Sequence, residues 1–130
     1  MKNLMVVLSI AALMLMGTTA WAGSKNVTFQ WTQQIPSPNN LKEWHIYQAS
    51  TAGGENQGGT PIATIPFTTV QSQYSYSMAI NFPDGAKTTY YFKMDVMTTG
   101  NVKSDLSNEA SATVDLTVPP VPGGFTITVQ

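Results

Sequence analysis

The sequence predicts an all-β protein, built as a sandwich of two antiparallel sheets. Six short segments between Val27 and Leu116 are predicted to be strands, and five of them alternate apolar and polar residues with a period of two, which is typical of strands with one buried face. Loops rich in glycine, proline and asparagine separate these segments. No window in this part of the chain has a helical period. Short strands joined by such turns therefore favour two packed sheets.

The first three expected strands lie in the N-terminal half of this region. Val27–Thr32 alternates cleanly. Glu43–Ala49 follows a loop with two prolines and places Trp44 and Ile46 on one face. Pro61–Ile65 comes after a glycine-rich connection, and its proline suits a strand at a sheet edge.

The last three expected strands lie in the C-terminal half of this region. Tyr74–Phe82 has an apolar residue at nearly every second position and ends at the turn Pro83-Asp84-Gly85. Tyr90–Met97 and Ala110–Leu116 repeat the pattern. The in-phase apolar residues expected to fill the core are Phe29, Trp31, Trp44, Ile46, Ile80, Phe82, Tyr90, Phe92, Met94 and Val96.

Composition restricts the classes of function. The chain has 130 residues, 10% of them charged, a formal net charge of -1 and no cysteine. A disulfide framework and a thiolate metal site are therefore excluded. All 6 basic residues are lysines, so no arginine can clamp a phosphate. Because the net charge is slightly negative, we expect no general attraction to nucleic acid or anionic lipid. We expect no nucleic-acid partner.

Residues 1–22 have the pattern of a secretory signal peptide. Leu4–Met16 is apolar apart from one serine, and Ala20-Trp21-Ala22 places small residues at the two positions that a signal peptidase reads. The apolar run is shorter than the ~20 residues needed to span a bilayer. We predict a signal-peptide helix over 1–22 and cleavage after Ala22. The product is expected to be periplasmic or extracellular, with no stable membrane anchor.

The run FPDGAKTTYYFKMDV, residues 82–96, resembles part of a fibronectin type III domain. Its order of proline, glycine, tyrosine and alternating apolar residues is similar to the family pattern, with one extra aspartate before the glycine. The resemblance covers about residues 27–114. It implies an immunoglobulin-like sandwich over 23–117, with Tyr90 as a tyrosine corner whose hydroxyl bonds back to the backbone. It implies no particular function, because such folds carry many.

The chain departs from the family pattern at both ends. Only Gly23–Asn26 precede the first strand, so the family's strand A is missing. A linker-like segment, Val118–Gly124, is followed by a strand-like segment over residues 125–130. Three placements remain open for this last segment: its own domain, another subunit, or no partner. Its in-phase apolar residues, the expected strand donors, are Phe125, Ile127 and Val129.

One polar strand face is the candidate contact surface. The family topology places Glu43–Ala49 beside Tyr90–Met97, so their outward residues are expected to share an exposed face. Ordinary cross-strand pairing, worth ~0.2–1 kcal/mol per pair, is one interpretation. A shallow recognition face for protein or carbohydrate is the other, with the long loops as alternative contact sites. The residues of this face are His45, Tyr47, Tyr91, Lys93, Asp95 and Met97.

No catalytic or metal-binding motif accompanies these residues. The single histidine, His45, cannot build a multi-histidine metal site, and no nucleophile elbow is present. We therefore expect no enzyme, no metal and no cofactor. The primary hypothesis is a secreted, non-enzymatic binding or adhesion module of the cell surface. The alternative is a self-assembling subunit of a surface or extracellular filament that donates its C-terminal strand.

Overall fold

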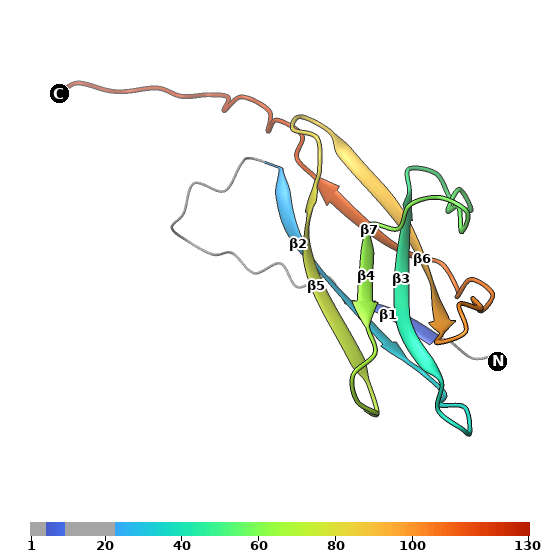
Figure 1. Ribbon diagram of the computed structural model, residues 1–130. Helices are drawn as coiled ribbons and strands as arrows, with labels where there is room; N and C mark the ends of the chain where they lie inside the picture. Colours follow the sequence, from blue (N-terminus) through green and yellow to red (C-terminus); the bar gives the residue numbers. More distant parts are fainter. Residues whose placement is uncertain (1–4, 10–22) are drawn as a thin grey trace.

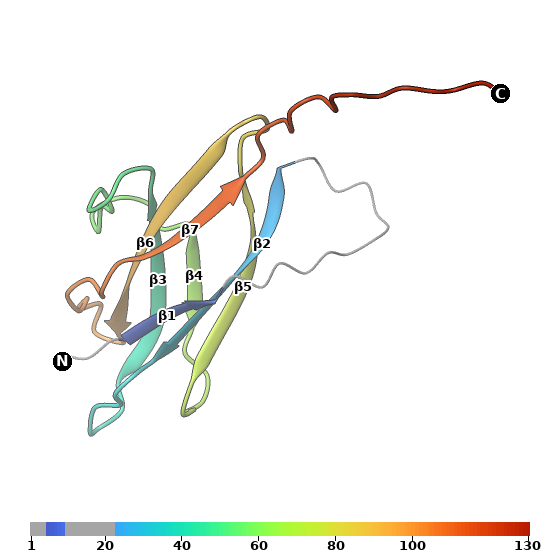
Figure 2. The same ribbon diagram turned by 180° about the vertical axis from the view of Figure 1, so that it is seen from behind.

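The computed structural model describes residues 5–9 and 23–130, and its seven strands form two antiparallel sheets (Figures 1 and 2). The first sheet has the order β1-β2-β5 and consists of β1 (Met5–Ser9), β2 (Ser24–Thr32) and β5 (Tyr74–Asn81). The second has the order β4-β3-β6-β7 and consists of β4 (Ala63–Pro66), β3 (Leu41–Ala49), β6 (Lys87–Thr98) and β7 (Ala110–Asp115). The predicted all-β, two-sheet architecture is confirmed.

The six predicted strands are all present, with ends that differ from the prediction by at most three residues. Alternation succeeds because each strand has one face against the other sheet. In β2, for example, Val27, Phe29 and Trp31 are buried, while Thr28 and Gln30 between them are half-exposed. The hydrophobic effect thus fixes which face of each strand turns inward.

Aromatic side chains join the two sheets. The ring centroids of Phe29 and Phe92 are 5.1 Å apart in an edge-to-face arrangement, and those of Trp31 and Trp44 are 5.3 Å apart. Such geometry is favourable for aromatic quadrupoles, worth about 0.5–1.5 kcal/mol per pair beyond area burial. Of the residues expected in the core, all are buried except Tyr90.

Tyr90 does not form the tyrosine corner that the resemblance implies. Its ring packs on Phe82 with the centroids 5.1 Å apart, and the side chain is half-buried. Its hydroxyl makes no hydrogen bond to the described residues. The family's diagnostic contact is therefore not found in the described chain.

The start of β2 and the end of β7 meet at one end of the sandwich, here called the Gly23 end. The amide of Phe82 donates to the Gly23 carbonyl at 2.7 Å, and the amide of Gly85 donates to Leu116 at 3.0 Å. Gly23 has a φ of 103°, and a Cβ there would collide with the Phe82 carbonyl oxygen. This position therefore requires glycine.

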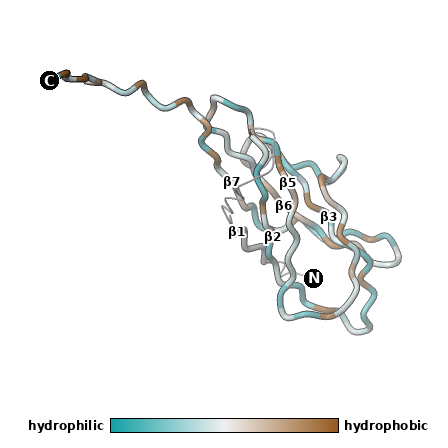
Figure 3. Tube along the Cα trace, turned by 90° about the vertical axis from the view of Figure 1, so that its left-hand side faces the viewer, coloured by the Kyte–Doolittle hydropathy of each residue, from teal (hydrophilic) through white to brown (hydrophobic). Residues whose placement is uncertain are grey.

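The C-terminal tail (Val118–Gln130) leaves the Gly23 end and runs away from both sheets (Figure 1). Its apolar residues, brown at the end of the tube in Figure 3, are exposed: Phe125 by 87%, Ile127 by 81% and Val129 by 90%. It forms no strand. In this single chain the tail does not pair with the described strands of its own domain, and the placement in another subunit stays a prediction.

The helix expected over residues 1–22 is not confirmed. Met5–Ser9 instead form β1, antiparallel to β2, and the rest of this segment lies outside the described residues. The signal peptide, its cleavage after Ala22 and the division at residues 117 and 124 remain predictions.

Candidate functional site

The outer face of β3 and β6 is covered, which corrects the prediction of an exposed face. His45 is 5% exposed, Tyr47 1% and Asp95 0%, whereas Tyr91, Lys93 and Met97 are only half-buried. The cover comes from two loops, residues 50–62 and 99–109, whose side chains bond to the face. The topology implied by the resemblance identified the two strands as neighbours, and alternation selected their outward residues, but neither showed that loops lie over them.

Asp95 is the centre of a hydrogen-bonded group. It lies directly opposite His45 in the β3–β6 register, and its Oδ1 is 2.6 Å from His45 Nδ1. Its Oδ2 accepts from the Tyr47 hydroxyl at 3.0 Å and from Gln57 Nε2 at 2.8 Å. A fully buried carboxylate is stable only with such partners, since its desolvation is otherwise costly.

Loop residues complete this group. Gln57 Nε2 also donates to the Ser104 carbonyl at 2.7 Å, so one amide ties both loops to the sheet. Lys103 Nζ donates to the Tyr47 hydroxyl at 3.1 Å and to the Gln57 carbonyl at 3.3 Å. We call Glu43, His45, Tyr47, Gln57, Asp95 and Lys103 the outer-face cluster.

Two groups of the cluster have shifted pKa values. Burial raises the pKa of the Tyr47 hydroxyl, and the hydrogen bond from Lys103 opposes that shift. The same hydrogen bond raises the pKa of Lys103. Both shifts favour a neutral phenol beside a charged ammonium, which is the pairing that the donor and acceptor geometry requires.

The geometry around His45 does not support a nucleophilic site. Nδ1 faces Asp95, and Nε2 faces Glu43 Oε1 at 3.0 Å. A general base needs one ring nitrogen free to take a proton from the nucleophile. Within the described chain both ring nitrogens of His45 face carboxyl groups, so the histidine links Asp95 to Glu43.

The 99–109 loop is also bound along the edge of β6. Two serines of the loop make the same contacts with this strand. The Ser104 hydroxyl accepts from the Val96 amide at 3.0 Å, and the Ser107 hydroxyl accepts from the Met94 amide at 2.9 Å. The amides of both serines donate back to the same strand, at 2.9 and 2.8 Å. These serines take the place of a neighbouring strand along the part of β6 that lies beyond Ala110, the first residue of β7, so the loop is held without regular pairing.

Two carboxyl groups, those of Glu55 and Glu109, lie where the end of the 99–109 loop contacts the 50–62 loop. Glu109 Oε2 accepts from the Gly53 amide at 2.6 Å, and this bond lowers the pKa of Glu109. Glu55 is 8% exposed, and neither of its carboxyl oxygens has a hydrogen-bond partner among the described residues. Burial, followed by the neighbouring Glu109, raises the pKa of Glu55.

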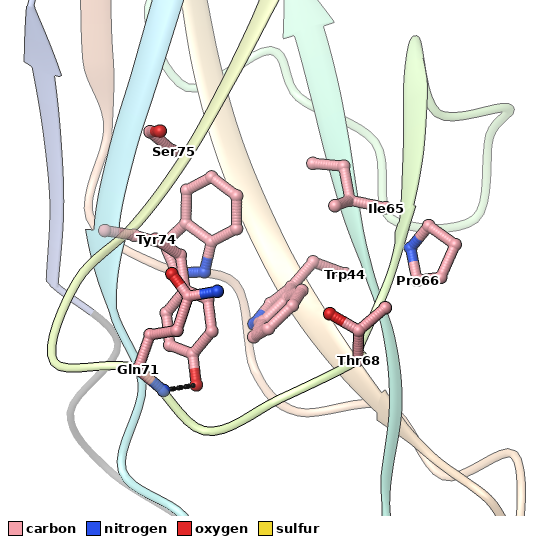
Figure 4. A pocket seen from close by; sticks show the side chains of 8 residues that line it. Trp44, Ile65, Pro66, Thr68, Gln71, Tyr74 and Ser75 are labelled. Carbon is pink, nitrogen blue, oxygen red and sulfur yellow. Dashed lines mark hydrogen bonds between the residues drawn. The ribbon is translucent and has the colours of Figure 1, made fainter.

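A small cavity lies between the two sheets, where β4 and the start of β5 approach each other (Figure 4). It has a volume of about 150 Å³, and its walls include Trp44, Tyr74 and Gln71. The backbone N–H of Gln71 donates to the Tyr74 hydroxyl at 2.9 Å, which is the dashed line in Figure 4. Among the described residues that line the cavity none is acidic or basic, and its aromatic walls are almost fully buried.

Sequence reasoning missed Gln57, Lys103, Glu55 and Glu109 as members of buried groups. All four stand in loops, where no periodicity places a side chain. The one available signal was loop length, since loops of more than ten residues that lie beside a sheet usually pack on it. No group of three or more metal-ligating side chains occurs in the described residues.

No protein-family model matches this chain, and no curated protein matches it. Residues 5–9 and 23–130 contain no helix with the length and hydrophobicity required to cross a membrane. The fold is therefore established as a two-sheet antiparallel sandwich compatible with an immunoglobulin-like arrangement, and membership of the fibronectin type III family remains a resemblance.

Proposed function

We propose that this protein is an exported, non-enzymatic binding module that recognises a protein or carbohydrate with its two braced loops. The observation that carries the proposal is the outer-face cluster, which fixes loops 50–62 and 99–109 to the sheet. Binding residues commonly stand on loops positioned by a rigid scaffold. Loops fixed before binding lose less conformational entropy when a partner arrives.

The tip of the 99–109 loop supports this proposal. Val102 is 62% exposed, yet its amide donates to Thr98 Oγ1 at 3.2 Å and its carbonyl accepts from the Thr98 amide at 2.9 Å. Asn101, with a φ of 62°, makes the turn, and Lys42 Nζ donates to its Oδ1 at 3.1 Å. The result is an apolar side chain held outward by a rigid turn, a suitable anchor for a partner.

The 50–62 loop supplies the polar part of this surface. It consists mainly of glycine, threonine, serine, asparagine and glutamine. Small polar residues of this kind provide adaptable hydrogen bonding in loop-based binding sites. The low charge of the chain favours a neutral partner surface over a strongly charged one.

The non-enzymatic part of the proposal rests on His45. Both of its ring nitrogens face carboxylates, and the cluster around it is closed by the loops. The export part rests on residues 1–22, whose pattern is that of a cleavable leader. The mass of the protein recovered from the periplasm or medium of an expressing bacterium tests cleavage after Ala22.

Two exposed valines provide a matched test of the loop surface. Val102→Asp places a charge at the tip of the 99–109 loop, and Val70→Asp places one in the β4–β5 loop, where Val70 is 63% exposed. We expect Val102→Asp to reduce binding to a glycan array or an array of immobilised extracellular proteins by about tenfold or more. Val70→Asp should bind as the parent does.

The controls separate binding from folding. Circular dichroism should be the same for both variants, because both valines are exposed. Equal binding by the two variants would remove the 99–109 loop from the proposed surface. Absence of binding by the parent to every array component would argue against the binding function itself.

A further inference from the structure

We propose that residues 125–129 of a second copy of this chain form the neighbour of β2 in the processed protein, in the place that β1 takes here. The inference rests on the proposed export, because cleavage after Ala22 removes β1. It goes beyond that function, since it assigns a self-assembly surface and its occupant.

The acceptor is the edge of β2 that β1 now covers. β1 and β2 pair in a five-residue antiparallel register, with Leu8 opposite Phe29 and Val6 opposite Trp31. Phe29 and Trp31 are each 1% exposed. Without β1, the backbone N–H and C=O groups along this edge of β2 lose their partners. The exposed edge then belongs to the strand that carries Phe29 and Trp31.

The occupant of this edge must have alternating residues. In β2 the inward Phe29 and Trp31 are buried, whereas the outward Thr28 and Gln30 are half-exposed. The segment Met5–Leu8 is apolar at four consecutive positions, including position 7 opposite Gln30. It therefore lacks the polar residues that the outward positions favour.

The segment 125–129 has the pattern that β1 lacks. Its apolar residues stand at every second position, with Thr126 and Thr128 between them. Threonine and the flanking β-branched residues have high strand propensity. Its three apolar side chains are 81–90% exposed in the single chain, so a sheet edge would remove them from water.

Among the antiparallel registers that turn the apolar residues inward, one places all three opposite the buried residues Val27, Phe29 and Trp31. Ile127 then lies opposite Phe29, which puts Thr128 opposite Thr28 in a favourable threonine pair. The complete register pairs Phe125 with Trp31, Thr126 with Gln30, Ile127 with Phe29, Thr128 with Thr28, and Val129 with Val27.

The direction of the tail favours a second copy over the same chain. The tail leaves from the Gly23 end (Figure 1), whereas a strand antiparallel to β2 must begin at the opposite end, beside Thr32. In its own domain the tail would have to run the length of β2 and then reverse. The prolines at 119, 120 and 122 stiffen that path.

A second copy placed end to end requires no reversal. The tail of one subunit points away from its Gly23 end and can enter the next subunit beside Thr32, running back along β2. Each subunit then gives one strand and receives one, in a constant direction. Such a head-to-tail contact forms open filaments, or rings where the rotation closes.

A disulfide test reads the register directly, because the chain has no cysteine of its own. The exported double variant Gln30→Cys/Thr126→Cys places thiols directly opposite each other, at a separation that a disulfide can bridge. Under mild oxidation we expect a ladder of covalent oligomers on a non-reducing gel. The matched control Gln30→Cys/Ile127→Cys puts the second thiol on the opposite face and should give little ladder.

A second pair of variants tests the contact without cross-linking. Ile127→Asp should reduce oligomers by about tenfold or more at fixed protein concentration, measured by light scattering after size exclusion. Thr126→Asp, which faces outward, should reduce them far less. Both changes lie in an exposed tail, so neither is expected to prevent folding.

The outcomes separate this inference from the proposed export. A product that retains residues 1–22 contradicts export. A correctly cleaved product that stays monomeric, or whose two cysteines join within one chain, overturns strand donation between copies while leaving export intact. Equal ladders from the two cysteine pairs would also overturn it, because they indicate random collision.

Discussion

The two long loops and the C-terminal tail are similar in composition but opposite in structure. Both kinds of segment lack regular strands and are rich in small or conformationally restricted residues. The loops are held by Gln57, Lys103 and Glu109, each of which bonds to another element. Within residues 5–9 and 23–130 the tail makes no such polar anchor, and it exposes Phe125, Ile127 and Val129.

The difference shows what orders a segment without secondary structure. A loop lies on a sheet when its polar side chains match donors and acceptors there, because each buried bond avoids an unsatisfied group. A segment with alternating apolar residues has no such partners to offer. It needs the backbone edge and the apolar interior that a sheet provides.

The largest expected effect comes from removing the Asp95 carboxyl group, which lies at the centre of the cluster that holds the loops. Asp95→Ala leaves the bonding groups of His45, Tyr47 and Gln57 without their shared acceptor. We expect a loss of about 3–5 kcal/mol in the free energy of unfolding, measured by urea denaturation. The exposed Asp115→Ala is the matched control and should change it little. Equal losses would contradict a central role for the cluster.

A smaller, pH-dependent effect is expected at Glu55. Burial raises its pKa in the folded state, so its contribution favours folding below the unfolded pKa and is lost as pH rises through the folded pKa. Glu55→Gln should therefore stabilise the protein by about 1 kcal/mol at neutral pH. That gain should fade at acidic pH, where Glu55 is protonated.

Denaturation of both proteins across a pH series checks this sign. Glu109→Gln is the informative control, because its pKa is lowered by the Gly53 amide and its contribution is lost as pH falls. A stability gain of Glu55→Gln that grows at acidic pH would contradict a raised pKa of Glu55 in the folded protein.

The smallest effect is expected in the tail. Ile127→Asp should change the free energy of unfolding of the dilute monomer by less than about 0.5 kcal/mol, since the side chain is 81% exposed. Thermal unfolding at low protein concentration measures this. A large loss in the monomer would mean that the tail packs on its own domain.

Much of the fold could be predicted from alternation alone. Strands β2, β3 and β6 were expected from residues such as Phe29, Ile46 and Met94, and these residues are buried. Local periodicity suffices here because each of these strands has one face against the opposite sheet. The helix expected in residues 1–22 was not confirmed, since Met5–Ser9 pair with β2 instead.

The candidate site was predicted only in part. The resemblance implied that the strands of His45 and Asp95 are neighbours, and in the structure the two residues are directly opposite. The prediction of an exposed face was wrong for His45, Tyr47 and Asp95. Alternation distinguishes the two faces of a strand, but it contains no information about a loop that folds back over the polar one.

The sequence by itself determined the strands, their inward faces and the strand-like character of residues 125–129, because these follow from spacing along the chain. Only the tertiary structure decided which polar groups are buried and which backbone edge takes a further strand. Those properties depend on segments far apart in sequence: Gln57 and Asp95 meet across 38 residues, and β1 lies beside β2. Contacts of that range are set by the packing of the whole domain.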